Sequence, residues 1–204
     1  MFKLSSKLIM MSLIWVITAQ TLMAQDFTLA EESSAEIKGT STLHEWTTTV
    51  PDVTGKLVVE KAFLKKSGPK NGDEIKSVEV SFKVKTMDGG RGSTMNNKIF
   101  NAFKEPEYPE VTFKSTAPIV TTQTIDKSTG KFKVKAVGDL SMAGTTKSVE
   151  LELEGQKMEN GDLHFLGSHT LKMTEFDIKP PSAMFGQIVC GDDVTINFDI
   201  TAKQ

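Results

Sequence analysis

Residues 131–155 read KFKVKAVGDLSMAGTTKSVELELEG, and their alternation is the clearest indication of the fold. In residues 131–136 apolar side chains alternate with lysines, and in residues 148–155 they alternate with glutamates. This period of two is typical of a β-strand that buries one face and exposes the other to water. Residues 143–146 supply a turn between the two runs. The stretch therefore predicts an antiparallel β-hairpin.

The same alternation recurs along most of the chain. Asn160-Gly161 is the clearest turn between two runs, because both residues tolerate the positive φ of a type I′ turn. Residues 127–130 form a second turn, and Asn71-Gly72 closes a longer loop. The pattern predicts an all-β chain of about eight antiparallel strands. These strands are expected at residues 35–41, 53–60, 78–84, 111–117, 131–136, 148–155, 163–173 and 194–201.

One segment, residues 93–109, breaks this alternation. Its apolar residues recur every four positions, as they do along one side of a helix. We expect one short helix that is capped by Ser93 or Thr94 and ends before Pro106. The residues that set the spacing are Met95, Ile99 and Phe103.

Strands with one apolar face form either a sandwich of two sheets or a closed barrel. Hairpins between sequential strands favour the barrel. Many inward positions carry small side chains that cannot fill such a barrel, so we predict an apolar cavity. The alternative is an interior filled by phenylalanines, in which the small residues mark bends. The small residues are Gly39, Ser41, Gly55, Ser115, Ala136, Gly138, Gly155 and Gly167, and the phenylalanines are Phe82, Phe132, Phe165 and Phe198.

The N-terminal residues read MFKLSSKLIMMSLIWVITAQTLMAQ, which is typical of a secretory signal peptide. Two lysines precede an apolar run from Leu8 to Ile17, and Ala24 marks the expected cleavage point. We expect residues 1–24 to be removed and residues 25–204 to form a single domain in the periplasm or outside the cell. An uncleaved membrane anchor is the alternative, although the apolar run is short for a membrane span.

Composition argues against several classes of function. The net charge of −2 becomes more negative once Lys3 and Lys7 are removed, which argues against nucleic-acid binding. Arg91 is the only arginine, so groups for phosphate recognition are scarce. Cys190 is the only cysteine, so no internal disulfide forms. We expect Cys190 to be a small buried residue, with a reactive thiol or an intermolecular bridge as alternatives.

The histidines do not suggest a metal site or a catalytic site. His164 and His169 lie five residues apart on one expected strand, so they face opposite sides of it. Cys190 alone supplies no convincing third metal ligand, and no serine lies in a nucleophile elbow. We therefore expect no metal, no cofactor and no catalytic residue. His169 faces the interior, either as a donor to a ligand head group or as an ordinary core histidine. His44 is expected at the corner between the first two strands.

Residues 180–186 read PPSAMFG, an unusually apolar loop. Its two prolines restrict the backbone, so the segment suits a stiff connection at the rim of a barrel. We expect Met184 and Phe185 to fold over the mouth, where they either contact a ligand or merely plug the barrel. Both interpretations predict that Phe185 is largely buried.

Three stretches together resemble one known family. Residues 97–116 read NKIFNAFKEPEYPEVTFKST, residues 137–155 hold the hairpin described above, and residues 174–200 read TEFDIKPPSAMFGQIVCGDDVTINFDI. In this order they are similar to the signature of the YceI-like polyisoprenoid-binding family, across nearly the whole mature chain. Two stretches depart from it. GGRGSTMNN has Gly92 where an acid is expected beside Arg91, and GTSTLHEW differs from the commoner first strand.

The resemblance implies an eight-stranded, antiparallel, lipocalin-like β-barrel with an elongated apolar cavity. It also implies a non-enzymatic protein that holds a long-chain isoprenoid lipid, such as a polyprenyl lipid or a quinone tail, for carriage, storage or protection. Its partner is then an apolar lipid, with transient contacts to a membrane surface or an envelope protein, and it is a monomer or a homodimer. The candidate cavity and mouth residues are Val80, Phe82, Val84, Ile99, Phe103, Val134, Leu140, Leu151, Leu153, Phe165, His169, Leu171, Met173, Phe176, Met184, Phe185, Ile196 and Phe198.

Two other functions stay open at this point. A barrel filled by its own side chains would be an interaction module that recognises another envelope protein through its outer surface. An enzyme acting on a lipid or a small oxidant would use His169 or Cys190. A lipid that is extracted with the protein would favour the carrier over the first alternative. Unchanged activity in His169→Ala and Cys190→Ser would exclude the second.

Overall fold

The computed structural model describes residues 24–204, so all of the expected signal peptide except Ala24 lies outside the described residues. In this range the chain forms a 12-stranded antiparallel sheet with one α-helix, α1 (Ser93–Ala102). The strands are β1 (Ala24–Leu29), β2 (Ser34–Ser41), β3 (Glu45–Val50), β4 (Val53–Glu60), β5 (Glu74–Lys83), β6 (Glu110–Ser115), β7 (Ile119–Asp126), β8 (Lys131–Met142), β9 (Thr145–Lys157), β10 (Leu163–Lys172), β11 (Ser182–Ala183) and β12 (Ile188–Lys203). Three short 3₁₀ turns are η1 (Val84–Thr86), η2 (Met173–Phe176) and η3 (Met184–Gly186).

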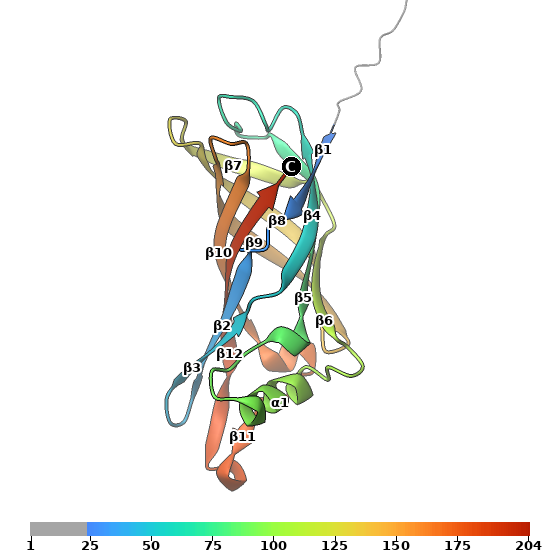
Figure 1. The fold of residues 1–204 in the computed structure, drawn as a ribbon, viewed down its shortest axis with the longest axis vertical. Helices are drawn as coiled ribbons and strands as arrows, with labels where there is room; N and C mark the ends of the chain where they lie inside the picture. The colour runs from blue at the N-terminus through green and yellow to red at the C-terminus, as the bar shows by residue number, and fades with distance from the viewer. Residues whose placement is uncertain (1–23) are drawn as a thin grey trace, which may run out of the picture.

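The sheet closes into a barrel (Figure 1). Around it the strands follow the order β1-β4-β5-β6-β8-β9-β10-β12, and β12 pairs again with β1, so the ring is complete. Neighbouring strands are antiparallel, and the predicted hairpin between residues 131 and 155 pairs continuously from Lys131↔Gln156 to Met142↔Thr145. The prediction of a closed, eight-stranded antiparallel barrel is confirmed.

Three sides of the barrel each consist of two successive strands, β1 with β2, β3 with β4, and β6 with β7. Pro51 lies between β3 and β4, and Pro118 lies between β6 and β7, because proline cannot donate a ladder hydrogen bond. Between β1 and β2 the hydroxyl of Ser33 donates to the carbonyl of Thr201 and accepts from its amide, both at 3.1 Å. The chain thus bends at these points, and the strand after each bend continues the same side of the barrel.

One end of the barrel is closed by aromatic packing. Phe63, in the loop after β4, packs edge-on against Phe132 with ring centroids 5.2 Å apart, and Phe132 packs edge-on against Phe165 at 6.1 Å. Phe63 and Phe132 are fully buried. Lys157 holds the loop in place, because its Nζ donates to the backbone carbonyls of Leu64 and Lys65. Burial lowers the pKa of this lysine.

Helix α1 crosses the opposite end of the barrel (Figure 1). It begins after Gly92, which adopts a φ of 75°, and no side chain makes a capping hydrogen bond, so the prediction of a Ser93 or Thr94 cap is wrong. The helix ends before Pro106, as predicted. None of its residues is buried, although Ile99 and Phe103 pack against the core. Within residues 24–204 no helix has the length and apolar character needed to cross a bilayer.

Two hairpins, β2–β3 and β11–β12, project beyond α1 at this end (Figure 1). Their tips are joined by hydrogen bonds. The amide of Thr42 donates to the carbonyl of Val189 at 3.0 Å, and the hydroxyl of Thr42 donates to the carbonyl of Gln187 at 3.1 Å. The described molecule therefore has a closed end at Phe63 and Phe132 and a different end at α1 and the two hairpins.

Candidate functional site

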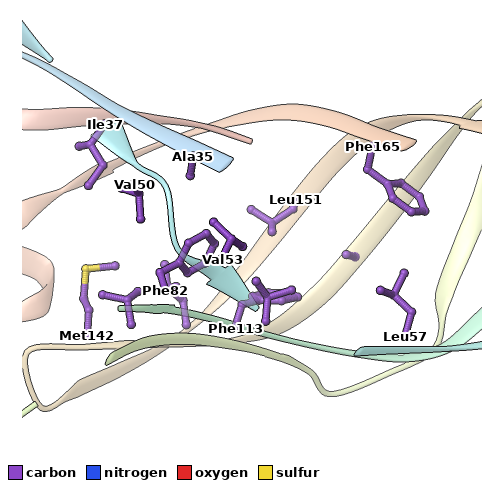
Figure 2. Close-up of a cluster of buried hydrophobic side chains, with 14 of the residues drawn as sticks. Ala35, Ile37, Val50, Val53, Leu57, Phe82, Phe113, Met142, Leu151 and Phe165 are labelled. Atoms are coloured by element: carbon purple, nitrogen blue, oxygen red, sulfur yellow. The ribbon is translucent and has the colours of Figure 1, made fainter. Parts of the chain in front are cut away.

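The barrel encloses a cavity of about 170 Å³, measured as the space that the centres of water molecules could occupy. A single water needs only about 10–15 Å³ on this measure, so the cavity is far larger than a packing defect. Figure 2 shows apolar side chains that enter the interior from opposite sides, with Met142 towards one end and Leu57 and Phe165 towards the other.

Inward-facing side chains of β12 retain accessible surface inside the barrel. Ile196, Phe198 and Ile200 alternate along the strand, line the cavity and are only partly buried. A barrel filled by its own side chains would bury these residues completely, as it does Phe63 and Phe132 at the closed end. The interior is therefore partly empty along its length and packed only at one end.

Glycines in the wall accommodate large neighbouring rings. A Cβ on Gly155 would overlap the ring of Phe132, and a Cβ on Gly138 would lie 2.6 Å from Cζ of Phe113. The indole of Trp46 likewise lies over Gly39. Each ring lies against a neighbouring strand instead of projecting across the lumen. The small inward residues thus preserve the cavity by giving the aromatic rings room at the wall.

Most of the residues predicted for the cavity line it, whereas four do not. The lining residues among them are Val80, Phe82, Ile99, Phe103, Val134, Leu140, Leu151, Leu153, Phe165, His169, Leu171, Met173, Ile196 and Phe198. Val84 and Phe176 are buried but lie in η1 and η2, outside the cavity lining. The alternation of residues 78–84 does not hold at Val84, because η1 begins there, and Phe176 lies beyond the expected strand 163–173, where no strand pattern applies.

Met184 and Phe185 do not fold over the mouth. Both are exposed, and Phe185 is the most exposed large apolar residue in the described chain. The prediction that Phe185 is buried is wrong. The cause is the backbone of η3, where Met184 has a φ of 51° and Phe185 a φ of 55°. These left-handed conformations form the turn of the projecting β11–β12 hairpin instead of a cover for the barrel.

The sequence patterns missed other lining residues. Pro181 reaches the cavity from the segment before β11, and Trp46 and Thr48 reach it from β3. The run EWTTTV of β3 is rich in threonine, so its alternation between inward and outward residues is weak. Further lining residues outside the candidate list are Leu29, Ala35, Ile37, Val50, Leu57, Ile75, Val78, Ala102, Val111, Phe113, Ile119, Ala136, Met142, Val149, Ile178, Val194 and Ile200, and the strand alternation places many of these on the inner face.

The cavity lining carries almost no polar side chains. It contains no aspartate, glutamate, lysine or arginine, and His169 is its one titratable group. Desolvation in this apolar setting lowers the pKa of His169, although nearby Glu175 opposes the shift. The imidazole is therefore held preferentially in its neutral form, which can donate one hydrogen bond and accept another.

The other histidines and the cysteine lie away from the cavity. His164 faces away from His169 as predicted, with its Nε2 2.8 Å from Oδ1 of Asp199. His44 lies in the turn between β2 and β3, as predicted. Cys190 is half-buried, and burial raises the pKa of its thiol. Among residues 24–204 no three histidine, cysteine or carboxylate side chains gather as metal ligands.

The cavity extends as far as helix α1. Ile99 and Ala102 of the helix and Phe103 directly after it line the cavity, and none of the three is buried. The chain just after the helix is tied down by Lys104, whose Nζ donates to Oδ2 of Asp177 at 2.7 Å and to the carbonyl of Ala143 at 3.3 Å. The hydrogen bond between Lys104 and Asp177 raises the pKa of Lys104 and lowers that of Asp177. Because the cavity lining ends at half-exposed residues here, we take this end as the mouth of the cavity, which α1 covers.

Comparisons with known proteins agree with this arrangement. The model of the YceI-like domain matches residues 27–202. The solved polyisoprenoid binding domain from Saccharophagus degradans is 11% identical, with a TM-score of 0.65, and the match covers 89% of this chain and 99% of that one. BcnA of Burkholderia cenocepacia is 16% identical, with a TM-score of 0.62 and coverages of 84% and 96%. The YCEI protein of Campylobacter jejuni is 20% identical, with a TM-score of 0.54 and coverages of 77% and 84%. No curated protein matches the sequence.

Proposed function

Because the chain belongs to the YceI-like domain family, we propose that it is a non-enzymatic binding protein that holds one long-chain isoprenoid lipid in its barrel. Its role is carriage, storage or protection of that lipid in the periplasm or outside the cell. The observation that carries the proposal is the empty apolar lumen, along which Ile196, Phe198 and Ile200 keep accessible surface. The class of ligand is supported by the similar fold of the polyisoprenoid binding domain from Saccharophagus degradans.

The energetics suit a long hydrocarbon. At about 25 cal/mol per Å², burial of several hundred square ångströms contributes on the order of 10 kcal/mol before the costs of association. No single polar contact has to dominate, so the fit between chain and lumen sets the preference among apolar ligands.

The lining also restricts the head group. Transfer of a charge into apolar surroundings without a partner is costly, and the lining offers no formally charged side chain. The buried part of the ligand is therefore uncharged. A carbonyl or hydroxyl can exchange a hydrogen bond with neutral His169, whereas a phosphate would stay at the mouth in contact with water.

Trp46 provides a probe for the test. It lines the cavity and is the only tryptophan in residues 25–204. Titration of the mature protein with geranylgeraniol should give a saturable change in tryptophan fluorescence with one site per chain. Ile196→Asn places an amide in the lumen and should weaken binding about tenfold, because an unpaired buried amide costs about 1–3 kcal/mol.

Leu166→Asn is the matched control, because Leu166 is exposed on the neighbouring strand β10 and does not line the cavity. It should bind the alcohol as the wild type does. An absence of saturable binding in a folded wild-type protein, or equal weakening by both substitutions, would contradict the proposal.

A further inference from the structure

Four exposed apolar residues gather at the ends of the two projecting hairpins, and we call them the apolar tip. Leu43 is 68% exposed, Met184 64%, Phe185 110% and Val189 39%. Leu43, Met184 and Phe185 are the three most exposed large apolar side chains among residues 24–204. Exposed apolar residues scattered singly are ordinary, whereas a group of them marks a surface for contact.

The apolar tip is one structural unit. Cys190 of β12 pairs with Ser41 of β2, and Thr42 bonds to both Gln187 and Val189, so the turn that carries Leu43 lies beside the turn that carries Phe185. On the other side, the amide of Cys190 donates to the carbonyl of Pro181 at 3.0 Å. The paired hairpins thus hold the exposed side chains in a fixed convex projection.

The apolar tip carries no formal charge. No acidic or basic residue occurs between Lys179 and Asp192, or between Lys38 and His44. The remaining positions of these two segments hold prolines, small residues, hydroxyl groups, Gln187, Ile188 and Cys190. The nearest carboxylate along the chain is that of Glu45, which pairs with Thr40 below the turn of Leu43. An uncharged projection of this kind can enter the interface of a lipid bilayer without dehydrating an ion.

The apolar tip and the cavity mouth lie at the same end of the barrel. Pro181 and Trp46, which belong to the segments leading to the two tips, both line the cavity. Figure 1 shows the two hairpins projecting past α1, and Ile99 and Ala102 of this helix line the cavity. A flat surface that receives the tip therefore meets the end of the molecule through which the cavity opens.

We propose that the apolar tip inserts into the surface of a lipid bilayer and so presents the cavity mouth to the membrane. The inference rests on the proposed function, because an isoprenoid chain that enters from a bilayer avoids exposure to water. A protein pocket is less well matched, because recognition interfaces normally surround their apolar centre with a polar, hydrogen-bonding rim, whereas the tip presents four apolar side chains at its apex.

Flotation of the mature protein with vesicles of phosphatidylethanolamine and phosphatidylglycerol tests the inference. The double variant Met184→Ser/Phe185→Ser should lower the partition coefficient about tenfold or more, because it removes two side chains that lose apolar surface to lipid. Binding should persist in about 0.5 M salt, since it does not depend on charge. The matched control is Ile125→Ser/Met158→Ser, which changes two exposed apolar residues. Both lie towards the closed end, because Ile125 follows Thr124, the partner of Phe132, and Met158 follows Lys157. It should leave the partition unchanged.

A wild-type protein that does not float, or equal losses in the two double variants, would overturn the inference. So would a dimer in sedimentation that the tip variant disrupts, because it would assign the tip to a second copy of the chain. The geranylgeraniol titration separates this inference from the proposed function. Saturable binding without flotation overturns only the membrane contact, whereas tip-dependent flotation without saturable binding overturns the proposed function and leaves the contact in place.

Discussion

Gly39 and Trp46 illustrate how two residues shape the cavity wall. The indole lies over Gly39, and its Nε1 donates to the carbonyl of Thr40 at 2.8 Å, which fixes the ring against β2. Without that arrangement the largest side chain of β3 would project into the lumen. Gly39 is therefore needed for two reasons: it gives the indole of Trp46 room against the wall, and it thereby keeps the lumen free of the ring.

Gly39→Ala should displace the indole, because a Cβ at this position would lie 2.6 Å from Cε2 of Trp46. We expect a loss of about 1–3 kcal/mol in the free energy of unfolding, as for other overpacked sites. The emission of Trp46 should shift, and isoprenoid binding should weaken. Lys38→Ala, at the exposed neighbouring position, is the control. Unchanged stability and emission in Gly39→Ala would show that the ring is not held by this contact.

His169 should make ligand retention depend on pH. Burial lowers its pKa in the folded protein, so the unfolded chain binds a proton more readily as the pH falls below about 6.5. Stability from burial of the neutral imidazole is present above that pH and is lost as the pH falls through the lowered pKa. Protonation of His169 also places a charge in the apolar lumen. A bound ligand would dehydrate that charge further, so protonation opposes ligand binding.

Geranylgeraniol binding to the wild type should therefore weaken between about pH 7.5 and about pH 5, whereas binding to His169→Gln should vary much less. Glutamine keeps a donor and an acceptor but cannot be protonated in this range. The measurement is the dissociation constant from Trp46 fluorescence at both pH values. If the two proteins show the same pH dependence, protonation of His169 is not its source.

Single residues in regular strands could be placed from the sequence, and residues in turns could not. Alternation put Val134, Phe165 and His169 on the inner face correctly, because the pleat repeats every two residues. Phe185 was placed wrongly, since the direction of a turn depends on its φ angles. Two consecutive non-glycine residues at positive φ are rare, and the sequence PPSAMFG gave no indication of them.

At the scale of elements, α1 lies across one end of the cavity, and Lys104 ties the chain that follows it. The helix lies across the mouth without a buried residue, and Lys104 links the chain after it to the carboxylate of Asp177 beyond η2. A helix held in this way can move aside without unpairing the barrel, because its contacts with the strands are made by half-buried side chains.

Lys104→Met should loosen helix α1. We expect the dissociation rate of bound geranylgeraniol to rise several-fold while the melting temperature stays nearly unchanged, since Lys104 and Asp177 form a surface pair. Lys203→Met is the control, because Lys203 pairs with Glu32 at the same 2.7 Å distance near the C-terminus, at the other end of the barrel. Stopped-flow fluorescence of Trp46 measures the rates. Equal rates in the two variants would exclude a gating role for the Lys104–Asp177 pair.

The strands could be predicted from the sequence where only one of their two faces is apolar. The eight predicted strands all occur, and the hairpin turns at residues 127–130, 143–146 and 160–161 lie where their glycines allow positive φ. The strands β1, β3 and β7 were missed because each continues a neighbouring strand after a break, and their inner positions include threonine and other residues that obscure the alternation. The capping of α1 was missed because a backbone conformation at Gly92 replaces a side-chain cap.

At the scale of the whole molecule, the two ends of the barrel differ. Phe63, Phe132 and the loop that Lys157 holds close one end. The other end has helix α1, none of whose residues is buried, and the apolar tip. The alternation in the sequence could not predict this difference between the two ends. It indicates which face of a strand is buried, but not how much of the barrel interior is filled. A bound isoprenoid chain would extend from helix α1 towards the packed phenylalanines.

The central claim is that this lumen holds an isoprenoid lipid, and native mass spectrometry of the mature protein, purified gently from a bacterial envelope, tests it most directly. We predict one stoichiometric adduct that is released into organic solvent as a prenyl chain or a quinone. A mass equal to that of the polypeptide alone, unchanged after incubation with isoprenoids while the barrel stays folded, would contradict it.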